Sequence, residues 1–232
     1  MRPGGTCHER ERVAAGDRRA AALSDRESAF GRGKASRFRI AERARAFGAQ
    51  VFLIDHSLPQ DLAAVARRAV DDGADLLGVA GGDGTQALVA EIAAESGLPC
   101  VVIPAGTRNH LAMDLGLDRD DPSVALEALS DGVELRVDPG YAGDRAFVNN
   151  VLFGAYAALV QDPAYREDKI GTTVRILPEF LARHEGPELV VRAGLLTVDW
   201  PDAVLVSNNP YQVDDPAGLG RRARSTPGSW EY

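Results

Sequence analysis

The residues best suited to chemistry form one short stretch, Gly81-Gly82-Asp83-Gly84-Thr85, where an apolar run meets a helical pattern. Glycine lets a ligand approach the backbone closely, and the unpaired N–H groups at the start of the following helix suit a phosphate group. The Asp83 carboxylate repels phosphate unless a magnesium ion bridges the two, and the Thr85 hydroxyl is a hydrogen-bond donor. The stretch therefore predicts a phosphate or nucleotide site with a metal ion at Asp83.

Two other interpretations of these glycines are a dinucleotide-binding loop and a purely structural turn. The residues from Gly82 to Ala87 satisfy the G-x-G-x-x-G/A spacing of a dinucleotide-binding loop. In dinucleotide-binding proteins this loop follows the first strand, whereas here a strand and a helix are predicted before it. Those proteins also carry an acidic residue about 20 positions later, where this chain has Ile103-Pro104. A purely structural turn leaves the number of glycines unexplained, so the nucleotide site is favoured over both.

A second glycine turn, Pro104-Ala105-Gly106-Thr107, follows the next predicted strand, and Asn109 and His110 come directly after it. No Walker A sequence occurs in the chain. The stretch AFGRGKAS at residues 29–36 contains glycines and Lys34 without the Walker spacing. It fits a basic phosphate-contacting loop and a solvated linker equally well.

The elements that must position these turns follow from apolar periodicity, which alternates between helices and strands over residues 36–132. Helices are predicted over 38–48, 57–73, 86–97, 108–116 and 120–132, and strands over 49–54, 74–80 and 99–106. Continuous apolar strands that alternate with helices predict a parallel sheet covered on both faces. Ligands of such sheets bind beyond the carboxyl ends of the strands, where both glycine turns fall.

The sequence predicts an α/β protein, with an N-terminal Rossmann-like parallel-sheet domain followed by an incomplete β-sandwich domain. Four regions are expected: a disordered or aberrant N-terminal arm (1–35), the α/β domain (36–132), a partial β domain with an internal helix over 165–184 (133–224), and a polar tail (225–232).

Composition narrows the function. The net charge of −8 makes nucleic acid a poor partner, and the two cysteines, Cys7 and Cys100, are interpreted as free thiols in a reducing compartment. Neither a signal peptide nor an apolar run long enough to cross a bilayer is present. A cytoplasmic protein is expected.

The combination of G-G-D-G-T with P-x-G-T-x-N-H-x-A, one strand–helix–strand later, resembles the catalytic domain of the diacylglycerol kinase and lipid kinase family. That family shares a superfamily with sphingosine kinases and NAD kinases. The resemblance covers roughly residues 36–224. It implies ATP and Mg²⁺ in a cleft between an α/β domain and a β-sandwich.

Carried over by motif, the resemblance assigns nucleotide contacts to both turns. Asp83 would also act catalytically, through the metal ion and the transferring phosphoryl group, and Asn109 would cap the short helix or orient its loop. His110 is expected to be structural. The implied cofactor-binding residues are Gly81, Gly82, Asp83, Gly84, Thr85, Gln86, Ala87, Gly106, Thr107 and Asn109.

Two departures from the family pattern matter. Relatives begin with a strand carrying Asn-Pro and a Ser/Gly-rich loop, whereas residues 1–30 contain no such strand, and residues 29–36 are interpreted as a remnant of the loop. Relatives also continue into strands that carry an acidic general base, and the sequence after residue 224 departs from that pattern. A truncated chain without the usual C-terminal catalytic acid is therefore expected.

The implied function is an ATP-dependent lipid kinase-like transfer of the γ-phosphoryl group to a diacylglycerol-like hydroxyl, in phospholipid metabolism. The expected partners are nucleotide and lipid, with transient contact at a membrane surface. Two alternatives stay open: a non-catalytic nucleotide-binding remnant, and an NAD kinase-like enzyme. The sequence Asn109-His110-Leu111-Ala112 disfavours the latter.

Overall fold

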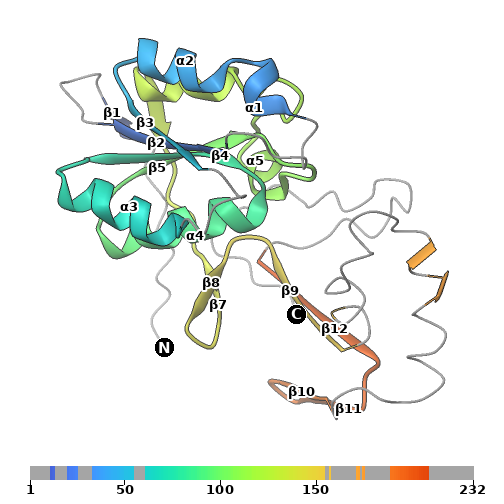
Figure 1. Cartoon of the computed structure of the whole chain (residues 1–232). Helices are drawn as coiled ribbons and strands as arrows, with labels where there is room; N and C mark the ends of the chain where they lie inside the picture. The colour runs from blue at the N-terminus through green and yellow to red at the C-terminus, as the bar shows by residue number, and fades with distance from the viewer. Residues whose placement is uncertain are drawn as a thin grey trace. The chain divides into compact units, whose positions relative to one another are not determined.

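The computed structural model describes residues 11–13, 20–25, 33–54, 61–154, 157, 171–172, 174–175 and 189–208. These residues divide into two compact units, one up to Asn149 and one over 150–208, and each is described by itself (Figure 1). The predicted domain boundaries stay predictions. The predicted tail and most of the predicted helix over 165–184 lie outside the described residues.

A four-stranded parallel sheet is the centre of the first unit, in the order β3-β2-β4-β5. Helices alternate with its strands, as the apolar periodicity predicts, and the α/β fold class is confirmed. The elements are β2 (Ala20–Asp25), α1 (Lys34–Arg37), α2 (Ile40–Ala46), β3 (Gln50–Ile54), α3 (Leu62–Asp71), β4 (Leu76–Gly81), α4 (Asp83–Glu95), β5 (Cys100–Pro104), α5 (His110–Asp114) and the 3₁₀ helix η1 (Val124–Leu129).

Strand β2 corrects the prediction for the N-terminal region. No strand is expected before residue 36, because the segment Ala20–Asp25 lacks β-branched and aromatic residues. In the structure it pairs in parallel with both β3 and β4, and Ala20, Ala21 and Ala22 are buried. Tertiary burial therefore decides the conformation of this segment against its weak local propensity.

The two faces of the sheet are covered by different helices, as Figure 1 shows. On one face, α2 and η1 pack on residues that include Leu76, Ala80 and Ile103. On the other face, α3 and α4 pack on Leu77 and Val79, both fully buried. This alternation along β4 places every second side chain in a different core, which explains why the strand is apolar throughout.

Helix ends follow local signals. Asp61 begins α3, where its side chain accepts a hydrogen bond from Ala63 N–H, so the predicted start at residue 57 is too early. Gly48, Gly73 and Gly97 have φ angles of 84°, 90° and 67° and follow the ends of α2, α3 and α4. These left-handed residues stop the helices at the predicted places.

The remaining strands pair in short antiparallel ladders. In the first unit, β1 (Glu11–Val13) pairs with β6 (Gly132–Glu134), and β7 (Gly140–Ala142) pairs with β8 (Arg145–Phe147). In the second unit, β9 (Asn150–Gly154) pairs with β12 (Ala203–Ser207), and β10 (Val190–Ala193) pairs with β11 (Leu196–Asp199). Strands β7 to β12 follow the parallel sheet in the chain, and the partial β domain over 133–224 stays a prediction. Among the described residues, no helix is long and apolar enough to cross a membrane.

Candidate functional site

The two glycine turns lie side by side because their strands are neighbours. Gly81, the last residue of β4, is the register partner of Pro104, the last residue of β5. In a parallel sheet both turns therefore leave the sheet at the same edge, the one at which such folds bind ligands. The structure thus brings together the two motifs that the sequence separates by a helix and a strand.

Close backbone contact joins the turns. A Cβ atom placed on Gly106 would lie 2.3 Å from Gly82 Cα and 2.8 Å from Gly82 N. Since only glycine lacks this atom, Gly106 allows an approach that any other residue would block. Gly82 precedes α4 in an extended conformation, so the contact fixes the point from which that helix starts.

Hydrogen bonds reinforce the contact between the turns. Gly106 N–H donates to Gly81 O at 3.0 Å and to Asn109 Oδ1 at 2.9 Å. Gln86 Nε2 donates to the same Gly81 oxygen at 2.9 Å, and the Gln86 side chain is completely buried. The carbonyl group at the end of β4 is therefore held from both turns.

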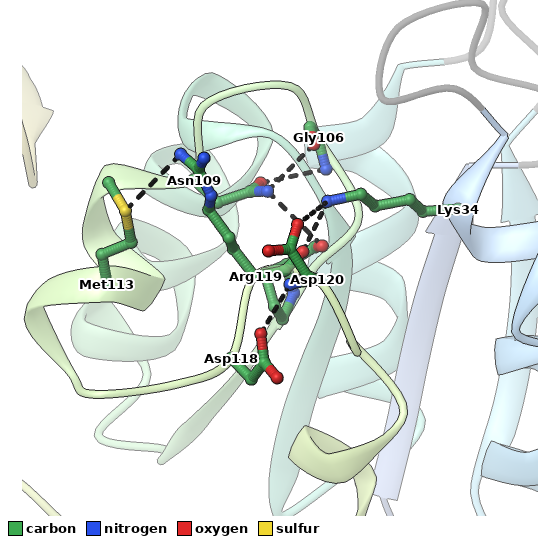
Figure 2. Close-up of polar contacts among 8 residues, drawn as sticks. Lys34, Gly106, Asn109, Met113, Asp118, Arg119 and Asp120 are labelled. Carbon is green, nitrogen blue, oxygen red and sulfur yellow. Dashed lines mark hydrogen bonds and ion pairs between the residues drawn. The ribbon is translucent and has the colours of Figure 1, made fainter. Parts of the chain in front are cut away.

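Asn109 orients the second turn (Figure 2). Its buried amide donates from Nδ2 to Gly106 O at 2.9 Å and to Pro104 O at 3.4 Å, while Oδ1 accepts from Gly106. Its φ of 55° is left-handed, and its side chain makes no capping hydrogen bond to α5. Of the two predicted roles, the structure supports orientation of the loop.

Asp83 is the first residue of α4 and is half-buried. Its Oδ1 accepts a hydrogen bond from Leu111 N–H at 3.1 Å, which links the start of α4 to α5. Among the described residues, none donates to its Oδ2. One carboxylate oxygen thus fixes the side chain and leaves the other for a ligand.

The other predicted residues divide by exposure. Gly84 and Thr107 are exposed, and a Cβ atom on Gly84 would meet nothing within 4 Å. Thr85 is half-buried, and its side chain packs against Gly81. Ala87 packs against a small cluster that includes Leu111. Open space therefore lies beside the first turn of α4 and at Thr107.

Lys34 is a residue whose place the sequence analysis left undecided. It begins α1, and its Nζ donates to Arg119 O at 2.5 Å and lies 3.8 Å from Asp120 Oδ1 (Figure 2). Burial lowers the pKa of Lys34, an effect that the nearby Asp120 opposes. The interpretation as a solvated linker is therefore wrong at this residue, because Lys34 is hydrogen-bonded to the loop that follows α5.

These features define a class: a parallel-sheet α/β protein with paired glycine turns at the carboxyl ends of neighbouring strands. Residues 19–142, more than half of the chain, match the diacylglycerol kinase catalytic domain. The chain belongs to this family, which confirms the resemblance. The match includes β2, so the alanine strand is part of the family's domain.

Individual relatives agree over shorter regions. A diacylglycerol kinase of Mycobacterium tuberculosis (strain ATCC 25618 / H37Rv) is 35% identical over 103 residues, which are 42% of this chain and 33% of that protein. One from Bacillus subtilis (strain 168) is 36% identical over 90 residues, 38% of this chain and 30% of that protein. These matches span about a third of the relatives' length.

A solved structure shows the same fold. The crystal structure of a diacylglycerol kinase from Bacillus anthracis strain Sterne aligns with a TM-score of 0.54 at 17% identity. The alignment covers 84% of this chain and 65% of that one. The likeness therefore extends beyond the first unit, and it concerns the fold.

Proposed function

We propose that this protein binds ATP with magnesium at the two glycine turns and transfers the γ-phosphoryl group to a hydroxyl group of a diacylglycerol-like lipid. The observation that carries the proposal is the backbone contact of Gly82 with Gly106, which joins two Gly-Thr turns beside the start of α4. Phosphoryl transfer depends on positioning and charge neutralisation, and rigid turns beside a helix N-terminus supply both. Family membership supports the same reaction.

The nucleotide phosphates are assigned to the exposed part of the turns. Gly84 and Thr85 lie in the first turn of α4, whose N–H groups have no helical acceptors. Open space at Gly84 lets a phosphate group reach this backbone, and the exposed Thr107 offers a second contact. Gln86 and Asn109 are buried, so their role in the proposal is to shape the turns.

Asp83 is the proposed ligand of the magnesium ion. Its Oδ1 is held by Leu111 N–H, and its Oδ2 can coordinate. Among the described residues, no three His, Cys, Asp or Glu side chains group into a metal site. This fits Mg²⁺, which takes one or two carboxylates and completes its shell with water and phosphate oxygens. When bound, the ion neutralises charge on the transferring phosphoryl group.

The implied setting follows from the substrates. ATP is a cytoplasmic nucleotide, and a diacylglycerol-like acceptor lies in a membrane, so the proposal places the protein in the cytoplasm with transient contact at the membrane surface. The reaction would convert a neutral lipid into an anionic phospholipid precursor.

Labelled ATP with magnesium and a panel of lipids tests the proposal. We expect transfer to a diacylglycerol, and a loss of about 100-fold or more in Asp83→Asn, whose side-chain oxygen still accepts from Leu111 and so preserves the fold. Nucleotide binding without transfer to any lipid would favour a non-catalytic remnant. Transfer to NAD alone would favour the NAD kinase alternative.

A further inference from the structure

A groove of about 930 Å³ with a mostly apolar lining runs along α4 in the first unit. Its walls come from α4, the edge strand β5, α5, η1, residues 132–139 and the β7–β8 hairpin. The volume lies within the range of small-molecule sites. Ala87, Ala90 and Ala94 form its α4 wall, where short side chains leave room beside the helix.

Two residues that line the groove adjoin Asp83. Ala87 lies one helical turn after Asp83 on α4, and Leu111, another lining residue, donates its N–H to Asp83 Oδ1. From Ala87 to Ala94, the last lining residue of α4, the wall extends about 10 Å at 1.5 Å per residue. A molecule with its hydroxyl group at Asp83 could therefore lay an alkyl chain along α4.

Residues 132–139 give the groove apolar surface in contact with water. Val133, Leu135 and Val137 line it with exposures of 52%, 48% and 44%. An alkyl chain in the groove would remove this surface from water, which is favourable in proportion to the area covered. The β7–β8 hairpin is hydrogen-bonded to α4, where Glu91 Oε1 accepts from Ala146 N–H on β8 at 3.2 Å.

Charge at the groove selects among lipids. The lining side chains that carry a charge at neutral pH are four carboxylates and one guanidinium, those of Glu91, Asp131, Glu134, Asp138 and Arg136. This excess of negative charge opposes an anionic headgroup and leaves an uncharged acylglycerol unaffected. It also favours release once phosphorylation gives the lipid a negative charge.

We propose that this groove is the acyl-chain subsite for an uncharged acylglycerol, an inference that rests on the proposed function. Titration calorimetry of the full chain with dioctanoylglycerol, below the concentration at which it aggregates, measures occupancy without nucleotide. The filling variant Ala90→Leu tests it. Leucine and alanine are both good helix formers, so the helix is preserved. The matched control Ala64→Leu lies at an exposed position on α3, away from the groove.

We expect saturable binding that Ala90→Leu weakens by about tenfold or more and Ala64→Leu leaves unchanged. Leu135→Glu is a second test. Because Leu135 is exposed, this substitution leaves the core intact, and it should weaken dioctanoylglycerol binding to a similar extent. Dioctanoyl phosphatidic acid should bind more weakly than the neutral lipid at low salt. Wild-type affinity in both groove variants, or no binding of the neutral lipid, would overturn the subsite.

The outcomes separate the subsite from the reaction. Groove-dependent binding without phosphoryl transfer would retain the subsite and refute the kinase proposal. Lipid phosphorylation that Ala90→Leu and Leu135→Glu leave unchanged would retain the kinase and refute the subsite. The groove could serve instead as a contact between two copies of the chain. In that case sedimentation would detect concentration-dependent dimers that Leu135→Glu disrupts and that added lipid does not affect. This result too would overturn the subsite.

Discussion

Gly106→Ala tests the contact that joins the two turns. The added methyl carbon would lie 2.3 Å from Gly82 Cα and 2.9 Å from Asn109 Oδ1. Its nearest neighbour is backbone, so a change of side-chain rotamer cannot relieve the overlap. The turns would have to separate by about 1 Å to reach ordinary van der Waals contact.

The cost follows from that separation. Overpacking in a well-packed region costs about 1–3 kcal/mol. Moving the turns apart also weakens the hydrogen bonds from Gly106 N–H to Gly81 O and Asn109 Oδ1, at about 0.5–1.5 kcal/mol each. We expect a total loss of about 2–6 kcal/mol, a large part of the roughly 5–15 kcal/mol that stabilises a typical domain.

Gly84→Ala is the matched control for the same substitution in the partner turn. Its added methyl group meets nothing within 4 Å and lies in α4, where alanine is a better helix former by about 1 kcal/mol. Stability should be kept or raised, while nucleotide binding should weaken because the methyl group occupies the space assigned to phosphate.

Urea unfolding followed by far-UV circular dichroism, together with titration of ATP and magnesium, compares the two variants. The expected pattern is opposite: Gly106→Ala loses stability, and Gly84→Ala keeps stability and loses affinity. A Gly106→Ala protein within about 0.5 kcal/mol of the parent would refute the argument that this glycine sets the spacing of the turns.

Three further predictions concern side chains around the site. Asn109→Ala removes the amide that donates to the Pro104 and Gly106 carbonyl groups and leaves Gly106 N–H with Gly81 O as its acceptor; it should cost about 2–4 kcal/mol in urea unfolding, and a loss under about 1 kcal/mol would contradict the network. Lys34→Met should cost about 1–2 kcal/mol, whereas Asp120→Asn should cost under about 0.5 kcal/mol because Asp120 is exposed; equal losses would contradict this order. Burial raises the pKa of the Cys100 thiol to about 12, so its alkylation near pH 8, mapped by mass spectrometry, should be at least about 100-fold slower than in urea. Because only the unfolded chain ionises this thiol between its ordinary pKa of 9.0 and about 12, stability should fall as the pH rises through that window.

Much of the fold could be predicted because its signals are local. The continuous apolar run of β4 and the glycines after α2, α3 and α4 mark the alternation of strands and helices. Strand β2 could not be predicted, because its alanines carry no strand signal and only its place between β3 and β4 makes it extended. The predicted helix over 120–132 is a short 3₁₀ segment, a distinction that apolar spacing does not make.

The candidate site could be predicted in its parts and not in its assembly. The glycine motifs predict the two turns from the sequence, and both motifs lie within the region that matches the family. The roles of Gln86 and Asn109 depend on where their amide groups point after folding, which residue type alone leaves open. Asn109 has a detectable signal, since asparagine tolerates left-handed backbone near helix starts. Gln86 has none, because a glutamine in a helix is usually exposed.

The position of β2 has a consequence for how the protein folds. It comes first among the strands of the sheet, yet Ala21 must pair with Gln50 and Ala20 with Leu76, far along the chain. Its alanines bury little apolar surface, so they provide weak driving force for early collapse. Strands β4 and β5, with α4 between them, can assemble from nearby sequence, whereas β2 must wait to be inserted at the centre of the sheet. Closure of that long loop would then be the slow step of folding, and a chain caught before it would expose the edges of β3 and β4 to other chains.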